Sequence, residues 1–166
     1  SLSHFGVAGS PPRLARSGRN LALLCLGLLA LLSAGLSLVM VGTEIWLDDP
    51  YIGFRYGANL ERGLGLVYNA GEQVEGYTAW LWVMLAWVAA LLDVDPLTFS
   101  QWINVASQMG TVWLVFHFGD RPGRSPLRAL VAPALVATHL ANVTWSMMGL
   151  ESNFLMVLAT GAVLLQ

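Results

Sequence analysis

Apolar residues occupy long uninterrupted blocks of this chain, and short segments between the blocks hold nearly all of its charge. The first block, residues 21–42, has no charged residue and is long enough to cross a bilayer as a helix, which takes about 20 residues. Further blocks occupy residues 78–92, 99–118 and 129–148, and a last one begins at Phe154. This pattern predicts a helical membrane protein with several spans.

The composition supports the same class. Hydrophobic residues make up 56% of the chain and charged residues only 11%, whereas a soluble domain carries about 25% charged residues. All eight basic residues are arginines, no basic stretch is suited to nucleic acid, and the single Cys25 has no disulfide partner. Because the last apolar block has 13 residues, too few for a span, we interpret the chain as a fragment of a larger membrane protein.

The arginines outside the apolar blocks set the expected orientation, because positive loops stay in the cytoplasm. The N-terminal tail and the segment 121–128 carry three arginines each. Both stay cytoplasmic if residues 78–92, with three tryptophans, lie in the interface or re-enter instead of crossing. The expected division is a cytoplasmic basic tail at 1–20, a first transmembrane helix at 21–42, an outer loop with juxtamembrane helices at 43–98, and further transmembrane helices at 99–166.

Two adjacent carboxylates, Asp48 and Asp49, stand at the end of the first predicted span. Aspartate at an N-cap accepts backbone N–H bonds and proline suits the first helical position, so Asp49 and Pro50 predict a helix over residues 51–62. Capping requires one carboxylate and leaves Asp48 unexplained. A spare carboxylate at the membrane edge is a functional candidate.

Other polar side chains near this pair suit a phosphate or a sugar. On the predicted helix, Tyr51 and Arg55 share one face. The Arg55 guanidinium fork could bind a phosphate well. The alternative is a helix lying on the membrane surface with its arginines at lipid headgroups. In the glycine-rich segment 63–78, carboxylates match sugar hydroxyls and rings match the apolar face of a sugar, although an ordinary loop has the same composition. The acids and rings of the segment 63–78 are Tyr68, Glu72, Glu75 and Tyr77. Glu151 lies between two apolar blocks at the same membrane edge.

Polar residues also recur at helical spacing inside two apolar blocks. We expect them to form hydrogen bonds between helices, each worth on the order of 1 kcal/mol. We expect His139 to be an interior histidine with a hydrogen-bond partner, because no cysteine or second histidine accompanies it. The two stripes are Gln101, Asn104, Gln108 and Thr111, and His139, Asn142 and Ser146.

Residues 47–82, LDDPYIGFRYGANLERGLGLVYNAGEQVEGYTAWLW, resemble the first outer loop of the multi-span GT-C glycosyltransferases. The likeness is most specific to the terminal arabinofuranosyltransferases of mycobacterial and corynebacterial cell walls. Their pattern is approximately Asp-Asp-Ala-Tyr-Ile-Ser-Phe-Arg-Tyr, then Gly-Leu-Val-Phe-Asn-Pro-Gly-Glu-Arg-Val-Glu-Gly-Tyr-Thr, and Gly149-Leu-Glu-Ser resembles a later Gly-Leu-Glu-Thr. This chain departs from the pattern at Pro50 (for Ala), Gly53 (for Ser), Ala70 (for Pro) and Gln73 (for Arg).

The resemblance implies an all-α polytopic membrane protein, a GT-C-type transmembrane helical bundle with interfacial helices. Its implied reaction moves a sugar, with arabinofuranose favoured, from a polyprenyl-phosphate donor to a cell-envelope glycan at the outer face of the plasma membrane. By resemblance Asp48 is the expected general base, and Asp49 assists it or binds a divalent metal (Mg²⁺ or Mn²⁺) with it. Arg55 is expected at the donor phosphate. The other expected sugar or acceptor contacts are Tyr51, Glu72, Glu75, Tyr77 and Glu151.

Two other functions stay open at this point. A transporter or flippase would use Asp48, Asp49 and Glu151 as an ion or proton site, and it predicts acids deep within the spans. A structural membrane subunit would need only a capped interfacial helix, and it predicts that Asp48→Asn is harmless.

Overall fold

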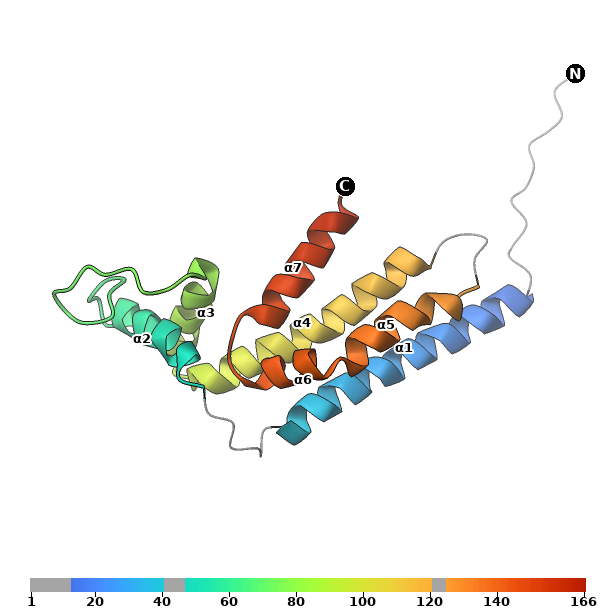
Figure 1. Ribbon diagram of the computed structural model, residues 1–166, viewed down its shortest axis with the longest axis horizontal. Coiled ribbons are helices and arrows are strands. Elements are labelled where there is room, and N and C mark those ends of the chain that lie inside the picture. Colours follow the sequence, from blue (N-terminus) through green and yellow to red (C-terminus); the bar gives the residue numbers. More distant parts are fainter. Residues whose placement is uncertain (1–12, 41–46, 121–124) are drawn as a thin grey trace, which may run out of the picture.

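The computed structural model describes residues 13–40, 47–120 and 125–166, and every regular element within them is a helix (Figure 1). The predicted all-α class is confirmed for this part of the chain. The elements are α1 (Arg13–Met40), α2 (Asp49–Glu61), α3 (Trp80–Leu91), α4 (Pro96–Gly119), the 3₁₀ turn η1 (Arg128–Leu130), α5 (Val131–Thr138), α6 (Leu140–Met147) and α7 (Ser152–Leu164).

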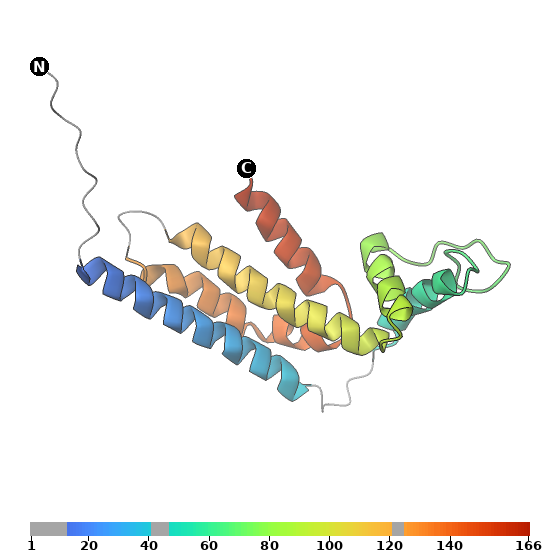
Figure 2. The ribbon, with the colours of Figure 1, turned by 180° about the vertical axis from the view of Figure 1, so that it is seen from behind.

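The helices form two groups (Figures 1 and 2). α1, α4, α5, α6 and α7 lie alongside one another as a bundle, and α2 and α3 pack together as a hairpin beyond the first turn of α4. The start of α4 is fixed where the hairpin joins it, because the Asp95 carboxylate accepts a hydrogen bond from the Thr98 backbone N–H (2.7 Å) and Pro96 occupies the first turn. The hairpin and its loop therefore lie at one end of the bundle.

By length and composition, one helix in the described residues can cross a membrane, the part of α1 from Gly18 to Val39. Most of its apolar surface is exposed in this structure, which suits contact with lipid and supports a membrane location. The predicted block at 129–148 is a helix pair, Arg128–Thr138 and Leu140–Met147, bent by 48° at the break, and it can form a second span. α3 and α7 are apolar but have only 12 and 13 residues, so the number of spans and their orientation stay predictions.

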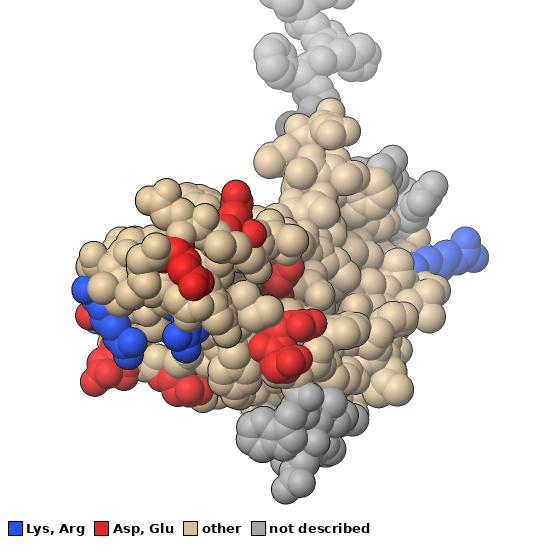
Figure 3. All heavy atoms as spheres, turned by 60° about the vertical axis from the view of Figure 1, so that its left-hand side comes forward, with Lys and Arg blue, Asp and Glu red and all other residues tan. Residues whose placement is uncertain are grey.

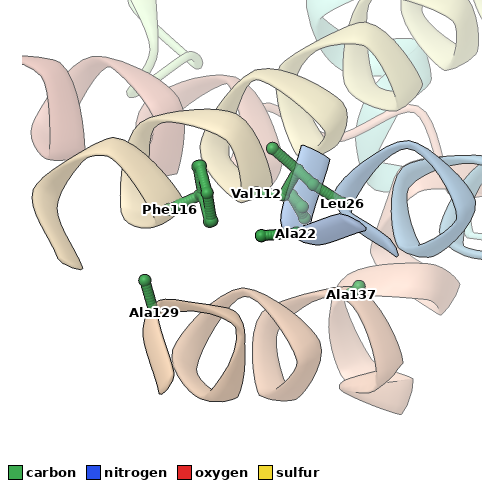
Figure 4. Packing of buried hydrophobic residues seen from close by; sticks show 6 residues of the cluster. All are labelled: Ala22, Leu26, Val112, Phe116, Ala129 and Ala137. Atoms are coloured by element: carbon green, nitrogen blue, oxygen red, sulfur yellow. The ribbon is translucent and has the colours of Figure 1, made fainter. Parts of the chain in front are cut away.

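The bundle is held by a cluster of small and large apolar side chains (Figure 4). Val112 and Phe116 of α4 are buried against Ala22 and Leu26 of α1, with Ala129 and Ala137 from the η1–α5 segment completing the cluster. Alanine at the contact lets the helix backbones approach closely, as is common between membrane helices. This packing fixes α4, which carries the hairpin at its first turn.

The polar stripe of α4 faces the interior of the bundle, as predicted. The Gln108 Oε1 atom accepts a hydrogen bond from Ser146 Oγ of α6 (2.6 Å) and lies 3.5 Å from the donor Ser37 Oγ of α1. Thr111 instead bonds a carbonyl of its own helix. The prediction of an interior His139 is wrong: its side chain is exposed, because its extended backbone (φ −68°, ψ 110°) places it at the break between α5 and α6.

Candidate functional site

The helix that follows the carboxylate pair begins earlier than predicted. α2 starts at Asp49 with Pro50 in its first turn, and Asp48 occupies the N-cap position. Asp48 has helical backbone angles (φ −84°, ψ −24°) and makes no side-chain cap hydrogen bond; a capping residue normally has extended angles that fold its side chain back onto the first turn. Asp49 lies inside the helix, at its first position, and not at the cap. The predicted capping role of Asp49 is therefore wrong. Both carboxylates are exposed, and neither accepts a hydrogen bond or forms an ion pair within the described residues.

The α2–α3 hairpin is tightly packed at one glycine. A Cβ atom at Gly57 would lie 2.6 Å from the Trp87 backbone nitrogen and 2.7 Å from the Ala86 carbonyl carbon. The two helices thus cross with their backbones in contact, and a side chain there would separate them. This close crossing positions the first turn of α2 relative to α3.

Two side chains of α2 fasten the loop that leads to α3. The Arg55 Nε atom donates to the Tyr68 carbonyl (2.7 Å), its Nη2 atom donates to Asn69 Oδ1 (3.2 Å), and its guanidinium lies 4.8 Å from the centre of the Tyr68 ring. Asn59 Nδ2 donates to the carbonyls of Val67 (2.8 Å) and Tyr68 (2.9 Å). Arg55 therefore has a structural role that its sequence position did not reveal. Its other guanidinium N–H groups take no part in these two bonds.

A buried tyrosine of α2 holds the last part of the same loop. The Tyr56 hydroxyl donates to the Val74 carbonyl (2.6 Å) and accepts from the Gly76 backbone N–H (2.9 Å). Its ring contacts the Tyr77 ring edge-on, with 4.9 Å between the centroids. Partial loss of solvent raises the pKa of the Tyr77 phenol, and the nearby Glu75 carboxylate and Tyr56 raise it further. At neutral pH the phenol therefore keeps its proton and can donate a hydrogen bond.

Three side chains from the hairpin and α4 hold the turn between α6 and α7, in which Glu151 lies. Two donate to backbone carbonyls of the turn and one to the carbonyl of the last residue of α6, so this segment is bonded to both the hairpin and α4. Such bonds to buried carbonyls fix a segment because breaking one leaves an unsatisfied acceptor. The bonds are Gln101 Nε2 to Met147 O (2.9 Å), Trp82 Nε1 to Gly149 O (3.0 Å) and Asn104 Nδ2 to Leu150 O (2.6 Å).

Gly149 lets this turn lie directly against the start of α2. Its φ is +79°, a conformation that favours glycine, and a Cβ atom there would lie 2.8 Å from Leu97 Cδ1 and 3.3 Å from Pro50 Cβ. The result is that Glu151, at the N-cap position of α7, is brought beside the first turn of α2. The sequence placed Glu151 at the same membrane edge as the carboxylate pair but gave no sign of these contacts.

A pocket of about 310 Å³ opens where α2, α3 and the α6–α7 turn meet. We call it the Asp49 pocket, because its polar lining includes Asp49, Tyr77 and Glu151, with Trp82 and Val83 among its apolar lining. Three residues expected at the site from the sequence are thus brought together from three separate segments. In Figure 3 most of the visible acidic side chains lie on this end of the molecule.

The other expected site residues lie outside this pocket. Asp48 and Tyr51 are exposed and do not line it, and the Tyr51 ring packs edge-on against Phe54. Glu72 accepts a hydrogen bond from Asn69 Nδ2 (3.0 Å) at the tip of the loop. Glu75 lines a second pocket of about 410 Å³ within the loop, and Tyr77 lines both pockets.

The donor set at the Asp49 pocket fits a hard divalent cation. Asp49 and Glu151 supply carboxylate oxygens, which Mg²⁺ and Mn²⁺ prefer, and Mg²⁺ commonly binds through one or two carboxylates together with waters and substrate phosphate. In the described residues no group of three or more His, Cys, Asp or Glu side chains is placed to hold a metal. Two carboxylates would leave the remaining coordination positions of such an ion to waters or a substrate phosphate.

Comparison with known proteins gives one informative likeness. No family model matches the chain, and no solved structure matches it. A terminal β-(1→2)-arabinofuranosyltransferase of Corynebacterium glutamicum is 40% identical over 91 residues, which cover 52% of this chain and 13% of that protein. The chain thus spans a small part of the relative's length, and the likeness suggests glycosyltransferase activity.

Proposed function

We propose that this chain contributes to the active site of a membrane glycosyltransferase of the GT-C type. The enzyme moves a sugar, with arabinofuranose the leading candidate, from polyprenyl phosphate to a cell-envelope glycan on the outer face of the membrane. The observation that carries the proposal is the Asp49 pocket, in which Asp49, Tyr77 and Glu151 meet. The likeness to an arabinofuranosyltransferase supports the reaction class.

The reaction joins the acceptor hydroxyl oxygen to the anomeric carbon of the sugar and breaks the bond between that carbon and the donor phosphate oxygen. The hydroxyl proton passes to a carboxylate base, and the lipid phosphate leaves with the bonding electron pair as an anion. A base has to lie within hydrogen-bond reach of the proton it takes. Because Asp49 lines the pocket and Asp48 does not, we assign Asp49 as the base and Asp48 as an assisting negative charge.

The neighbouring groups hold the sugar and the phosphate. The Glu151 carboxylate accepts hydrogen bonds from sugar hydroxyls, and the neutral Tyr77 phenol donates one. Arg55, expected from the resemblance at the donor phosphate, lines neither pocket and bonds the loop, so we assign it to holding the loop. A divalent metal bound with Asp49 would supply charge stabilisation to the leaving phosphate.

The test compares the two adjacent carboxylates in the same assay. The purified protein is incubated with a polyprenyl-phosphate sugar and a glycan acceptor, and the rate of transfer is measured. Loss of the general base should lower kcat by about 10²–10⁴-fold in Asp49→Asn, and Asp48→Asn should lower it by less than about tenfold. A wild-type rate in Asp49→Asn would overturn the assignment.

The alternative functions predict other outcomes. A transporter or flippase predicts acids deep within spans, whereas Asp48 and Asp49 are exposed at the start of a short helix. A structural subunit predicts no transfer by any variant or by the wild-type protein. Neither alternative makes a glycosidic bond, so the same assay separates the glycosyltransferase from both.

A further inference from the structure

We propose that the second pocket, within the α2–α3 loop, binds the acceptor glycan. This loop pocket is lined by residues 64–67 and 73–75 together with Tyr77, and its volume is about 410 Å³. The inference rests on the proposed glycosyl transfer and assigns its two substrates to separate pockets. The donor sugar lies in the Asp49 pocket, and the acceptor enters through the loop.

The lining of the loop pocket suits a neutral sugar. Gln73 and Glu75 offer an amide and a carboxylate for hydroxyl groups, and Val67, Val74 and the Tyr77 ring offer apolar surface for the C–H face of a sugar ring. None of the described residues that line it is basic. A phosphate group would therefore meet the Glu75 carboxylate with no cation in the lining to balance it, which favours the glycan over the lipid phosphate as the occupant.

The position of the loop pocket also favours the acceptor. Its lining comes wholly from the loop, which Figure 1 shows at the end of the molecule farthest from α5 and the start of α1. The Asp49 pocket instead includes Leu150 and Glu151 from the bundle. A glycan in water can reach the loop pocket without entering lipid, whereas a lipid-linked sugar arrives along the bundle. Because Tyr77 lines both pockets, the two substrates would meet at this residue.

The loop pocket is formed before any ligand binds. Arg55 and Asn59 hold the Val67–Tyr68 side of the loop, and Tyr56 holds the opposite side at Val74. A loop held in its binding conformation loses less conformational freedom when the ligand arrives, so the same contacts give tighter binding. The three α2 side chains therefore act as positioning residues for the acceptor.

The experiment measures glycan binding and transfer separately on the purified protein in detergent. The probe is a short soluble arabinofuranosyl oligosaccharide, and its binding is measured by calorimetry without any donor. Glu75→Gln and Gln73→Ala change exposed loop residues and should leave the circular dichroism spectrum unchanged. Each should weaken binding by about tenfold, as expected for loss of a hydrogen bond to the ligand. The matched control is Glu61→Gln, an exposed acid at the end of α2 that lines neither pocket, and it should bind as the wild-type protein does.

In turnover, the loop variants should raise the KM for the acceptor by the same factor and leave the KM for the donor within twofold of wild type. Unchanged acceptor binding in both loop variants, or a rise in the donor KM alone, would overturn the inference while leaving the proposed function intact. Loop-dependent oligosaccharide binding without transfer from any polyprenyl-phosphate sugar would support a glycan site and overturn the proposed function.

Discussion

The Gly149→Ala substitution tests how the α6–α7 turn places Glu151 against α2. Gly149 has φ +79°, and its new Cβ atom would lie 2.8 Å from Leu97 Cδ1 and 3.3 Å from Phe54 Cζ and Pro50 Cβ. The substitution therefore adds backbone strain and a steric clash at one position. The clash pushes the turn away from Leu97 of α4 and from α2, and the strain favours another backbone conformation at this position.

The expected magnitude follows from these two contributions. An alanine in the left-handed region costs about 1–2 kcal/mol, and an extra methyl group in a packed site costs about 1–3 kcal/mol. The steric cost should fall at the lower end, because Leu97 is only partly buried and its terminal methyl can rotate away. We expect Gly149→Ala to lower the free energy of unfolding by about 2–4 kcal/mol.

Gly63→Ala is the matched control. Gly63 has a similar φ of +74°, follows α2 in a Schellman arrangement in which Leu64 N–H donates to the Asn59 carbonyl, and a Cβ atom there meets no other atom within 4 Å. It should therefore cost only the backbone strain, about 1–2 kcal/mol. Equilibrium denaturant unfolding in detergent, followed by tryptophan fluorescence, measures both variants. Equal destabilisation of the two would refute the close packing of Gly149, and adding Leu97→Ala to Gly149→Ala should recover part of the difference.

Three further predictions concern the contacts around the two pockets. Trp82→Phe leaves the Gly149 carbonyl without its donor and should cost about 1–3 kcal/mol of unfolding free energy in the same assay; an unchanged stability would contradict the bond. Arg55→Lys removes the fork that holds the loop and should speed amide hydrogen exchange in residues 64–77, while exchange in α3 stays at the wild-type rate. Because folding raises the pKa of Tyr77 above 10.0, its neutral phenol contributes stability below pH 10.0 that is lost as the pH rises through the folded-state pKa. Thermal unfolding against pH should show this loss in the wild-type protein and a smaller one in Tyr77→Phe.

Part of the site could be predicted from the sequence because it depends on local patterns. The carboxylate pair followed by proline indicated the start of α2, and helical spacing indicated that Asn104 and Gln108 face other helices. The spacing of apolar blocks brought Glu151 to the same end of the molecule as Asp49. These inferences need only chain order and periodicity.

The remaining features depend on contacts that no local pattern contains. Which aspartate lines the pocket depends on the exact helix register, and α2 begins at Asp49 instead of after it. Tyr56 and Arg55 bond backbone carbonyls of the loop, and side-chain periodicity carries no information about such acceptors. Trp82 was one of three tryptophans that favoured an interfacial helix, yet its ring is buried and donates to Gly149.

In the proposed reaction the transferred sugar lies in the Asp49 pocket. A structure of the purified protein with a non-transferable polyprenyl-phosphonate sugar tests this most directly. We expect the sugar to lie between Asp49, Tyr77 and Glu151, with its anomeric carbon about 3–3.5 Å from the incoming acceptor oxygen when an oligosaccharide is also bound. A sugar bound elsewhere, with none of these three side chains in contact, would contradict it.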